Sequence, residues 1–186
     1  MQLLNIILPF LAAGALAQNQ TTGKLGDAMV VSNNPPMASY VAMFMPNGMK
    51  KLRGMVTAMS GKGGKGVDFN LMVMGLPEEG GPFSFHLHDQ PVPMNGNCTA
   101  TLAHLDPYQR GQTPACDMAM PQTCEVGDLS GKHGKIMGME AMKKFTDMYA
   151  SLVPGMGAFF GNRSIVIHYA NSTRLACANF TMGMMD

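Results

Sequence analysis

Two of the five histidines in this 186-residue chain, His86 and His88, lie one residue apart within the short apolar run FSFHLH. Residues i and i+2 of a strand point to the same face, so a strand here presents two imidazoles side by side. A third histidine, His168, ends the apolar run SIVIH, and His104 follows the run NCTATLA. Three or four imidazoles with no spare cysteine thiolate suit copper or zinc, so this pattern predicts a metal site.

Short strands are the elements that must position these rings. A helical pattern is found only at 138–152, within the turn-rich segment 89–162. The glycine-rich stretch 61–66 predicts a hairpin loop. Short strands around one long loop region predict an all-β fold, a β-sandwich or Greek-key barrel, in a single domain with its core at about residues 40–180. The predicted strands are 39–46, 50–59, 67–75, 83–88, 163–170 and 173–180.

Residues 1–17 resemble a secretory signal peptide, because an apolar, uncharged run ends in the small-x-small sequence ALA. The run is too short for a transmembrane helix, so we expect no membrane span and a mature domain over residues 18–186. The C-terminal residues lack the hydrophobic tail of a glycolipid anchor signal. We therefore expect a secreted protein, extracellular or associated with the cell wall, with glycosylation sequons at Asn19, Asn97, Asn162, Asn171 and Asn179.

The overall composition limits the partners and the covalent framework. A net charge of +1 and 13% charged residues give no sign of a nucleic-acid partner. In a secreted chain, four cysteines predict two disulfides, for which three pairings are possible.

The 21 methionines are unusually many, and five pairs of them have Met-x-Met spacing. Thioethers are soft ligands that favour Cu(I), so a methionine-rich surface that collects copper is one interpretation. Core packing is the other, and it is favoured for most of the set. Two pairs fall within predicted strands and are expected to pack: Met43/Met45 and Met72/Met74. Outside the strands, the better copper candidates are the pair Met118/Met120 and the tail 181–186.

Five motifs occur in an order that resembles the copper/zinc superoxide dismutases, closest to the fungal extracellular copper-only branch of that family. They are FHLHD, NCTATLAHLDPY, CEVGDLSGKHGKI, SIVIH and TRLACANF, and the likeness runs from about Leu52 to Phe180. The resemblance implies the Greek-key β-barrel of that family, with long loops and a metal centre.

By this resemblance, three histidines are permanent copper ligands: His86, His88 and His168. His104 matches the histidine that bridges copper and zinc in two-metal members, and that binds and releases copper during turnover. Arg174 matches the arginine that guides superoxide to the metal, where a fixed positive charge raises the capture rate of a small anion.

The resemblance also bears on two loop residues, and it implies a covalent link between the loop and the last strand. Asp128 is expected to organise loop backbone, as aspartate does in turns. His133 has no ligand counterpart in the family and is interpreted as a loop histidine. The disulfides expected on this basis are Cys98–Cys177, which matches the family's bridge, and Cys116–Cys124, which closes a small loop.

The chain departs from the two-metal members in ways that imply copper without zinc. Residues 105–127, where those members carry two zinc histidines, contain none, and one or two carboxylates cannot complete a four-ligand zinc site. Glu125 stands at one of those places and is expected to hydrogen-bond to His104 instead. Only six positions separate His168 from Arg174. The family's electrostatic loop is therefore shortened, and the copper site is expected to be open.

The resemblance implies an extracellular copper-only superoxide dismutase with one copper ion per chain and no zinc. Cycling of copper between Cu(II) and Cu(I) converts superoxide, the expected substrate, to oxygen and hydrogen peroxide. The alternative is a secreted, non-catalytic copper-binding or copper-delivery protein on the same scaffold, which needs the histidines but neither Arg174 nor Glu125. Both residues are present. The enzyme is therefore favoured, acting as a monomer in solution or at the cell wall.

Overall fold

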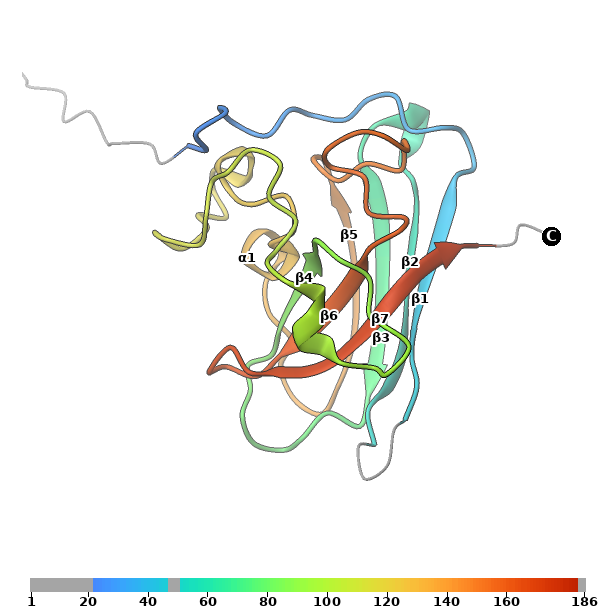
Figure 1. The fold of residues 1–186 in the computed structure, drawn as a ribbon, viewed down its shortest axis with the longest axis vertical. Helices are drawn as coiled ribbons and strands as arrows, with labels where there is room; N and C mark the ends of the chain where they lie inside the picture. Colours follow the sequence, from blue (N-terminus) through green and yellow to red (C-terminus); the bar gives the residue numbers. More distant parts are fainter. Residues whose placement is uncertain (1–21, 47–50, 184–186) are drawn as a thin grey trace, which may run out of the picture.

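The computed structural model describes residues 22–46 and 51–183, so the expected signal peptide at 1–17 and Asn19 lie outside the described residues. The described chain forms an antiparallel sheet of seven strands in the order β4-β6-β7-β1-β2-β3-β5 (Figure 1). The strands are β1 (Ser39–Phe44), β2 (Arg53–Ser60), β3 (Val67–Met74), β4 (Ser84–His88), β5 (Glu140–Asp147), β6 (Ser164–His168) and β7 (Arg174–Met182). The helical elements are short: α1 (Leu129–His133) and the 3-10 turns η1 (Lys62–Gly64), η2 (Cys98–Thr101) and η3 (Pro121–Thr123).

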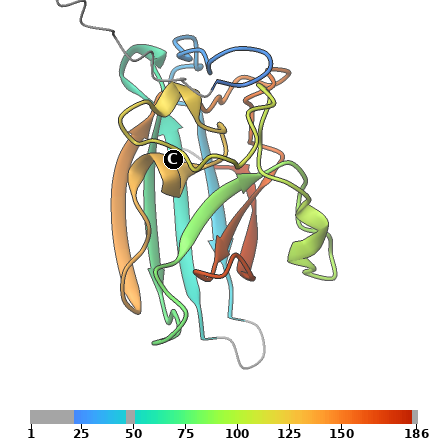
Figure 2. The same ribbon diagram turned by 90° about the vertical axis from the view of Figure 1, so that its left-hand side faces the viewer.

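The two edges of this sheet approach each other through side chains. Strands β1, β2, β3 and β5 form one wall, β4 and β6 form the other, and β7 joins them (Figures 1 and 2). Phe85 of β4 and Phe145 of β5 belong to the two edge strands, yet their ring centroids lie 6.0 Å apart. The sheet therefore curls into a barrel-like shape around an apolar core. The prediction of an all-β fold is confirmed.

Period-two patterning decides which side chains fill this core. Along β3, Val67, Phe69, Leu71 and Val73 are buried and the residues between them are not. Strand β6 differs, because all five of its residues are buried. The segment after β4 crosses beside β6, where the Ser164 hydroxyl donates to the carbonyl of Gln90. The predicted metal ligand His168 therefore stands at the end of a strand that is enclosed on both faces.

The helix predicted at 138–152 is wrong. Residues Glu140–Asp147 form β5, which pairs with all of β3 from Val67↔Asp147 to Met74↔Glu140. Exposure alternates with a period of two along the strand, as sheet pairing requires. Helix-favouring residues such as Ala141 and Lys143 suggested a helix, and pairing with an already exposed strand edge overrides that weak propensity. All six predicted strands are present with shifted ends.

Two disulfides tie the long loops to the sheet. Cys98 in η2 is bonded to Cys177 in β7, 79 positions further along the sequence. Cys116 is bonded to Cys124, eight positions away, and closes a small loop after the metal-site segment. The long bridge joins parts of the chain that no strand pairing connects directly.

Removal of the long bridge is predicted to cost more stability than removal of the short one. The loop-entropy relation gives about 4.5 kcal/mol for a closed loop of this length and about 2.5 kcal/mol for the short one. Chemical denaturation of a Cys98→Ser/Cys177→Ser variant, compared with Cys116→Ser/Cys124→Ser, measures the difference. Equal losses in the free energy of unfolding would contradict the entropic account.

A buried ion cluster joins α1 to the end of β5. The carboxylate of Asp147 accepts from Lys132 Nζ at 2.7 Å and from His133 Nε2 at 2.9 Å, and the side chains of Asp147 and Lys132 are fully buried. Its other oxygen accepts from the backbone N–H groups of Tyr149 and Ala150. Burial alone would raise the pKa of Asp147, but the charge of Lys132 and the bond from His133 hold that pKa well below its ordinary 3.8.

Asp147→Asn is predicted to destabilise the fold by about 3–5 kcal/mol at neutral pH, because it leaves Lys132 buried without its counter-charge. The pKa of Asp147 is lower in the folded chain than in the unfolded chain. Its contribution is therefore complete above about pH 4 and is lost as the pH falls below that value. Urea unfolding between pH 3 and pH 7 should show a flatter pH dependence in the variant. Asp68→Asn, at an exposed position of β3, is the matched control.

Candidate metal centre

Four histidines converge in the described structure. His86 and His88 of β4, His104 of the following loop and His168 of β6 each offer a ring nitrogen, and these four atoms all lie within 4.8 Å of one another. The Nε2 atoms of His88 and His168 are 3.2 Å apart. The four rings that the sequence singled out are thus brought together, and His133 is not among them.

The alternation of β4 aims its histidines away from the core. Phe85 and Leu87 are fully buried, so His86 and His88 point to the opposite face. The Leu87 backbone N–H donates to Gly127, and its carbonyl accepts from Leu105. Gly127 N–H in turn donates to the carbonyl of Leu105. These backbone bonds hold two loop segments against β4 and set His104 beside the strand pair.

Each ring is oriented by an oxygen on its other nitrogen. His88 Nδ1 lies 2.9 Å from the Leu102 carbonyl, and His168 Nδ1 lies 3.0 Å from the Ser172 carbonyl. His86 differs, because its Nε2 is 3.0 Å from the Ser130 hydroxyl and its buried Nδ1 has no hydrogen-bond partner. Rings that donate to oxygen in this way turn a lone pair of the remaining nitrogen toward the shared space. The donor set fits a single transition-metal ion.

Burial keeps these rings in the form that binds a metal. It lowers the pKa of His86, lowers that of His88 to about 3 and lowers that of His168 to about 4. Neighbouring rings that would carry like charges act in the same direction. His86, His88 and His168 are therefore neutral at ordinary pH, which is the state in which imidazole is a ligand.

Glu125 and Gln112 lie beside the outer nitrogen of His104. The Glu125 carboxylate is buried, with 6% of the residue exposed, and its Oε2 is 2.5 Å from His104 Nδ1. The amide nitrogen of Gln112 is 3.3 Å from the same atom. This carboxylate fixes His104 as the tautomer whose Nε2 faces the other three rings. The sequence pointed to Glu125, but nothing in its pattern pointed to Gln112.

Asp128 performs a task in the loop backbone. Its carboxylate accepts from the N–H of Gly131 at 2.7 Å and caps α1. It also lies 3.4 Å from His86 Nε2. Burial would raise the pKa of Asp128, but the bond and charge of His86 and the Gly131 N–H lower it to about 2. The cap positions Ser130, whose hydroxyl contacts His86, and no pattern in the sequence pointed to that serine.

Arg174 is joined to the metal centre through one carbonyl. Its guanidinium donates to the backbone oxygens of Cys98 and Leu102, and the Leu102 oxygen also accepts from His88. Cys98 is itself bonded to Cys177, three residues after Arg174. Burial lowers the pKa of Arg174, which stays far above physiological pH for a guanidinium. The structure therefore fixes a positive charge one backbone group away from a metal-facing ring.

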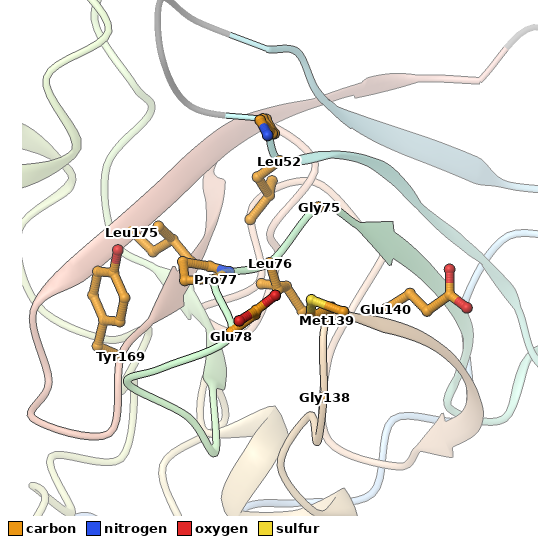
Figure 3. Close-up of a pocket in the computed structure, with 11 residues that line it drawn as sticks. Leu52, Gly75, Leu76, Pro77, Glu78, Gly138, Met139, Glu140, Tyr169 and Leu175 are labelled. Atoms are coloured by element: carbon orange, nitrogen blue, oxygen red, sulfur yellow. The ribbon is translucent and has the colours of Figure 1, made fainter.

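The centre opens into a hollow of about 470 Å³ at the surface. The side chains around it include His86, His104, Lys135 and Met118, and 59% of Met118 is exposed. A larger hollow, of about 890 Å³, lies elsewhere and is lined by Leu52, Leu76, Tyr169 and Leu175 among others (Figure 3). It contains no histidine, so the smaller hollow is the one that reaches the predicted chemistry.

The sequons lie at the surface wherever the structure describes them. Asn97, Asn162, Asn171 and Asn179 are all exposed. The Asn97 side chain accepts from Thr99 N–H at the start of η2, and Asn179 bonds both backbone groups of Val92. Glycosylation at these four positions stays a prediction.

The fold and the site together define an all-β metalloprotein with a four-histidine centre. No protein-family model matches the chain. The chain is 42% identical to the "Cell surface Cu-only superoxide dismutase" of Arthroderma benhamiae over 93% of its own length and 54% of that protein. It is 38% identical to "Cell surface Cu-only superoxide dismutase 5" of Candida albicans, over 84% of its length and 67% of that protein.

A solved structure gives the same result. Candida albicans Superoxide Dismutase 5 with Cu(II) superposes with a TM-score of 0.73 at 38% identity, covering 81% of this chain and 95% of that one. The chain belongs to the copper/zinc superoxide dismutase family, among the fungal cell-surface Cu-only superoxide dismutases. It spans about half the length of the first curated relative.

Proposed function

We propose that this protein is an extracellular superoxide dismutase with one copper ion per chain and no zinc. The observation that carries the proposal is the convergence of four ring nitrogens beside Arg174, which shares the Leu102 carbonyl with His88. The names of the relatives, which describe Cu-only superoxide dismutases, support the copper and the reaction. Their description as cell-surface proteins supports an extracellular or cell-wall location. None of the described helices has the length and apolar character needed to cross a membrane.

Four side chains would hold copper: His86 through Nδ1, and His88, His168 and His104 through Nε2. When bound, copper supplies the one-electron chemistry that converts two superoxide ions and two protons to oxygen and hydrogen peroxide. When His104 is not a ligand, its Nε2 is available to hold a proton, and Glu125 accepts from the Nδ1–H on the other side of the ring. This arrangement lets one ring deliver a proton toward the reduced substrate without turning.

Arg174 provides the attraction for the anionic substrate. Its guanidinium is fixed by two carbonyls, so its charge cannot swing away from the centre. A fixed charge near an open metal site raises the encounter rate of a small anion. A non-catalytic copper carrier on this scaffold, the competing function, needs neither this charge nor the Glu125–His104 bond.

Metal analysis and a dismutation assay on the secreted protein test the function together. We expect one copper per chain and no tightly held zinc, because His104 Nδ1 is bonded to Glu125 rather than free for a second metal. Superoxide should disappear faster than with the same concentration of free copper. Activity no greater than that of free copper would replace the enzyme with the carrier, and stoichiometric zinc would overturn the copper-only assignment.

Arg174→Ala should retain copper, since arginine is not a ligand, and should lower the rate of superoxide consumption roughly tenfold. The remaining rate should depend less on ionic strength, because the screened long-range attraction has been removed. Stopped-flow measurements at several salt concentrations give both quantities. Arg53→Ala removes an equal charge from an exposed position of β2 and should leave the rate nearly unchanged.

Glu125→Ala should also retain copper through His86, His88 and His168. Turnover should fall roughly 10- to 100-fold, because His104 loses the acceptor that fixes its tautomer and orientation. Glu125→Gln keeps an oxygen acceptor without the charge and should recover part of the rate. If both variants turn over superoxide at the wild-type rate, Glu125 has no role in the mechanism, although the assignment of the copper ligands would stand.

A further inference from the structure

Most of the methionines that the structure describes lie at the surface rather than in the core. Among the described residues, sixteen large hydrophobic side chains are exposed, and all but Leu25, Val30 and Leu102 are methionines. The buried hydrophobic core of the same residues contains no methionine. The expectation that Met43 and Met45 pack in the core is wrong, because 58% and 70% of these residues are exposed. Met72 and Met74 are only partly buried.

Strand register places several of these side chains next to one another. Met43 of β1 is opposite Met55 of β2, Met55 is opposite Met72 of β3, and Met72 is opposite Met142 of β5. Directly opposite residues on one face have Cβ atoms about 4.5–5.5 Å apart. Four methionines thus form a row across four neighbouring strands on the outer face of the sheet.

One end of this row borders a hollow. Met72, Met74, Glu140 and Met142 line a depression of about 400 Å³ between β3 and β5, with Val73 and Ala141 below them. Met72 is opposite Met142, and Met74 is opposite Glu140, so the four outward side chains lie at the corners of a rectangle. Figure 3 shows the Glu140 carboxylate directed away from Leu76 and Tyr169 of the larger hollow.

We propose that Met72, Met74 and Met142, with Glu140 beside them, form a binding site for Cu(I), separate from the histidine centre. Thioethers are soft, neutral donors that select Cu(I) over harder ions. Methionine has three rotatable bonds, so sulfur atoms from adjacent backbone positions can converge on one ion. The site uses residues of β3 and β5, whereas the histidines come from β4, β6 and the loop after β4.

The charges around the site favour a soft ion over a hard cation. Arg53 is opposite Met74, and Lys144 is two residues from Met142 on the same face, so two cationic residues and the single carboxylate of Glu140 border the three methionines. Calcium and magnesium require several oxygen ligands, and this surface offers one carboxylate against two cations. Three thioethers therefore carry the binding, and the carboxylate offsets part of the repulsion.

Equilibrium dialysis of the copper-loaded protein tests the proposal, under anaerobic reducing conditions with chelator-buffered Cu(I). The wild type should take up one Cu(I) per chain beyond the ion in the histidine centre. A Met72→Leu/Met74→Leu/Met142→Leu variant should lose that additional ion. A matched variant, Met43→Leu/Met59→Leu/Met182→Leu, removes three other exposed methionines and should keep it. The copper in the histidine centre should be unchanged in both.

Charge variants probe the same site by affinity. A unit charge about 4 Å away in water changes an ion's binding by roughly fivefold. Glu140→Gln should therefore weaken the additional Cu(I) about fivefold, and Arg53→Gln should tighten it by a similar factor. Neither variant alters a thioether. If neither variant changes the affinity for the additional Cu(I), that ion is bound elsewhere on the surface.

Three outcomes would overturn the proposal. They are no additional Cu(I) in the wild type, equal loss in the two triple variants, and a loss that simply follows the number of methionines removed. If the first triple variant does not fold, the single change Met142→Leu serves, because this residue is 65% exposed on an edge strand. It should weaken Cu(I) binding, and unchanged binding would count against the site. Because the readout is bound Cu(I) rather than turnover, the result stands whether or not the protein dismutates superoxide.

Discussion

The centre of this protein depends on keeping four imidazole rings partly or fully out of water, each with one nitrogen directed at a common space. Polar groups in such a position are costly unless they are bonded. In three of the rings, one nitrogen is bonded to an oxygen acceptor from Leu102, Ser172 or Glu125, which offsets part of this cost. The nitrogen on the other side of each ring remains available to bind a metal ion, and the buried Nδ1 of His86 has no hydrogen-bond partner in the protein. The arrangement is favourable for a metal site, whereas in an apolar core the unbonded ring nitrogens would only destabilise the fold.

Leu102 links this centre to the covalent framework. Its backbone lies at φ 60° and ψ −141°, a region that non-glycine residues rarely occupy. Such a conformation costs of order 1–3 kcal/mol and persists only where the surroundings impose it. Here the carbonyl that it redirects accepts from both His88 and Arg174. The Cys98–Cys177 bridge and Arg174 anchor the two ends of the segment that must hold this conformation.

The sequence predicted the strands and the paired histidines because both depend on a local period of two. His86 and His88 needed only the alternation of one strand to be recognised. His104, Glu125 and Arg174 could be assigned only through resemblance to a family. The bond between His104 and Glu125 spans 21 positions of the chain, and the bonds from Arg174 to Leu102 and Cys98 span 72 and 76.

Other features were out of reach of the sequence because they depend on tertiary pairing. Helix-favouring residues in β5 led to the wrong prediction of a helix, because this segment becomes a strand only by pairing with β3. Ser130 and Gln112 have ordinary loop surroundings in the sequence, and only the folded chain sets them against His86 and His104. The expectation that the pairs Met43/Met45 and Met72/Met74 pack rests on their strand positions alone. A period of two shows that alternate residues share a face, but it does not show which face is buried.

The two metal-binding surfaces differ in the oxidation states that they can hold. Imidazole nitrogen is a donor that suits copper in both states, whereas thioether sulfur favours Cu(I). An ion among Met72, Met74 and Met142 would therefore be held in one state, while the histidine centre can cycle. The proposed dismutation would release hydrogen peroxide, which oxidises exposed thioethers to sulfoxides with transfer of one oxygen atom and release of water. A sulfoxide no longer offers the soft sulfur donor, so the methionine site would lose its preference for Cu(I) wherever peroxide accumulates.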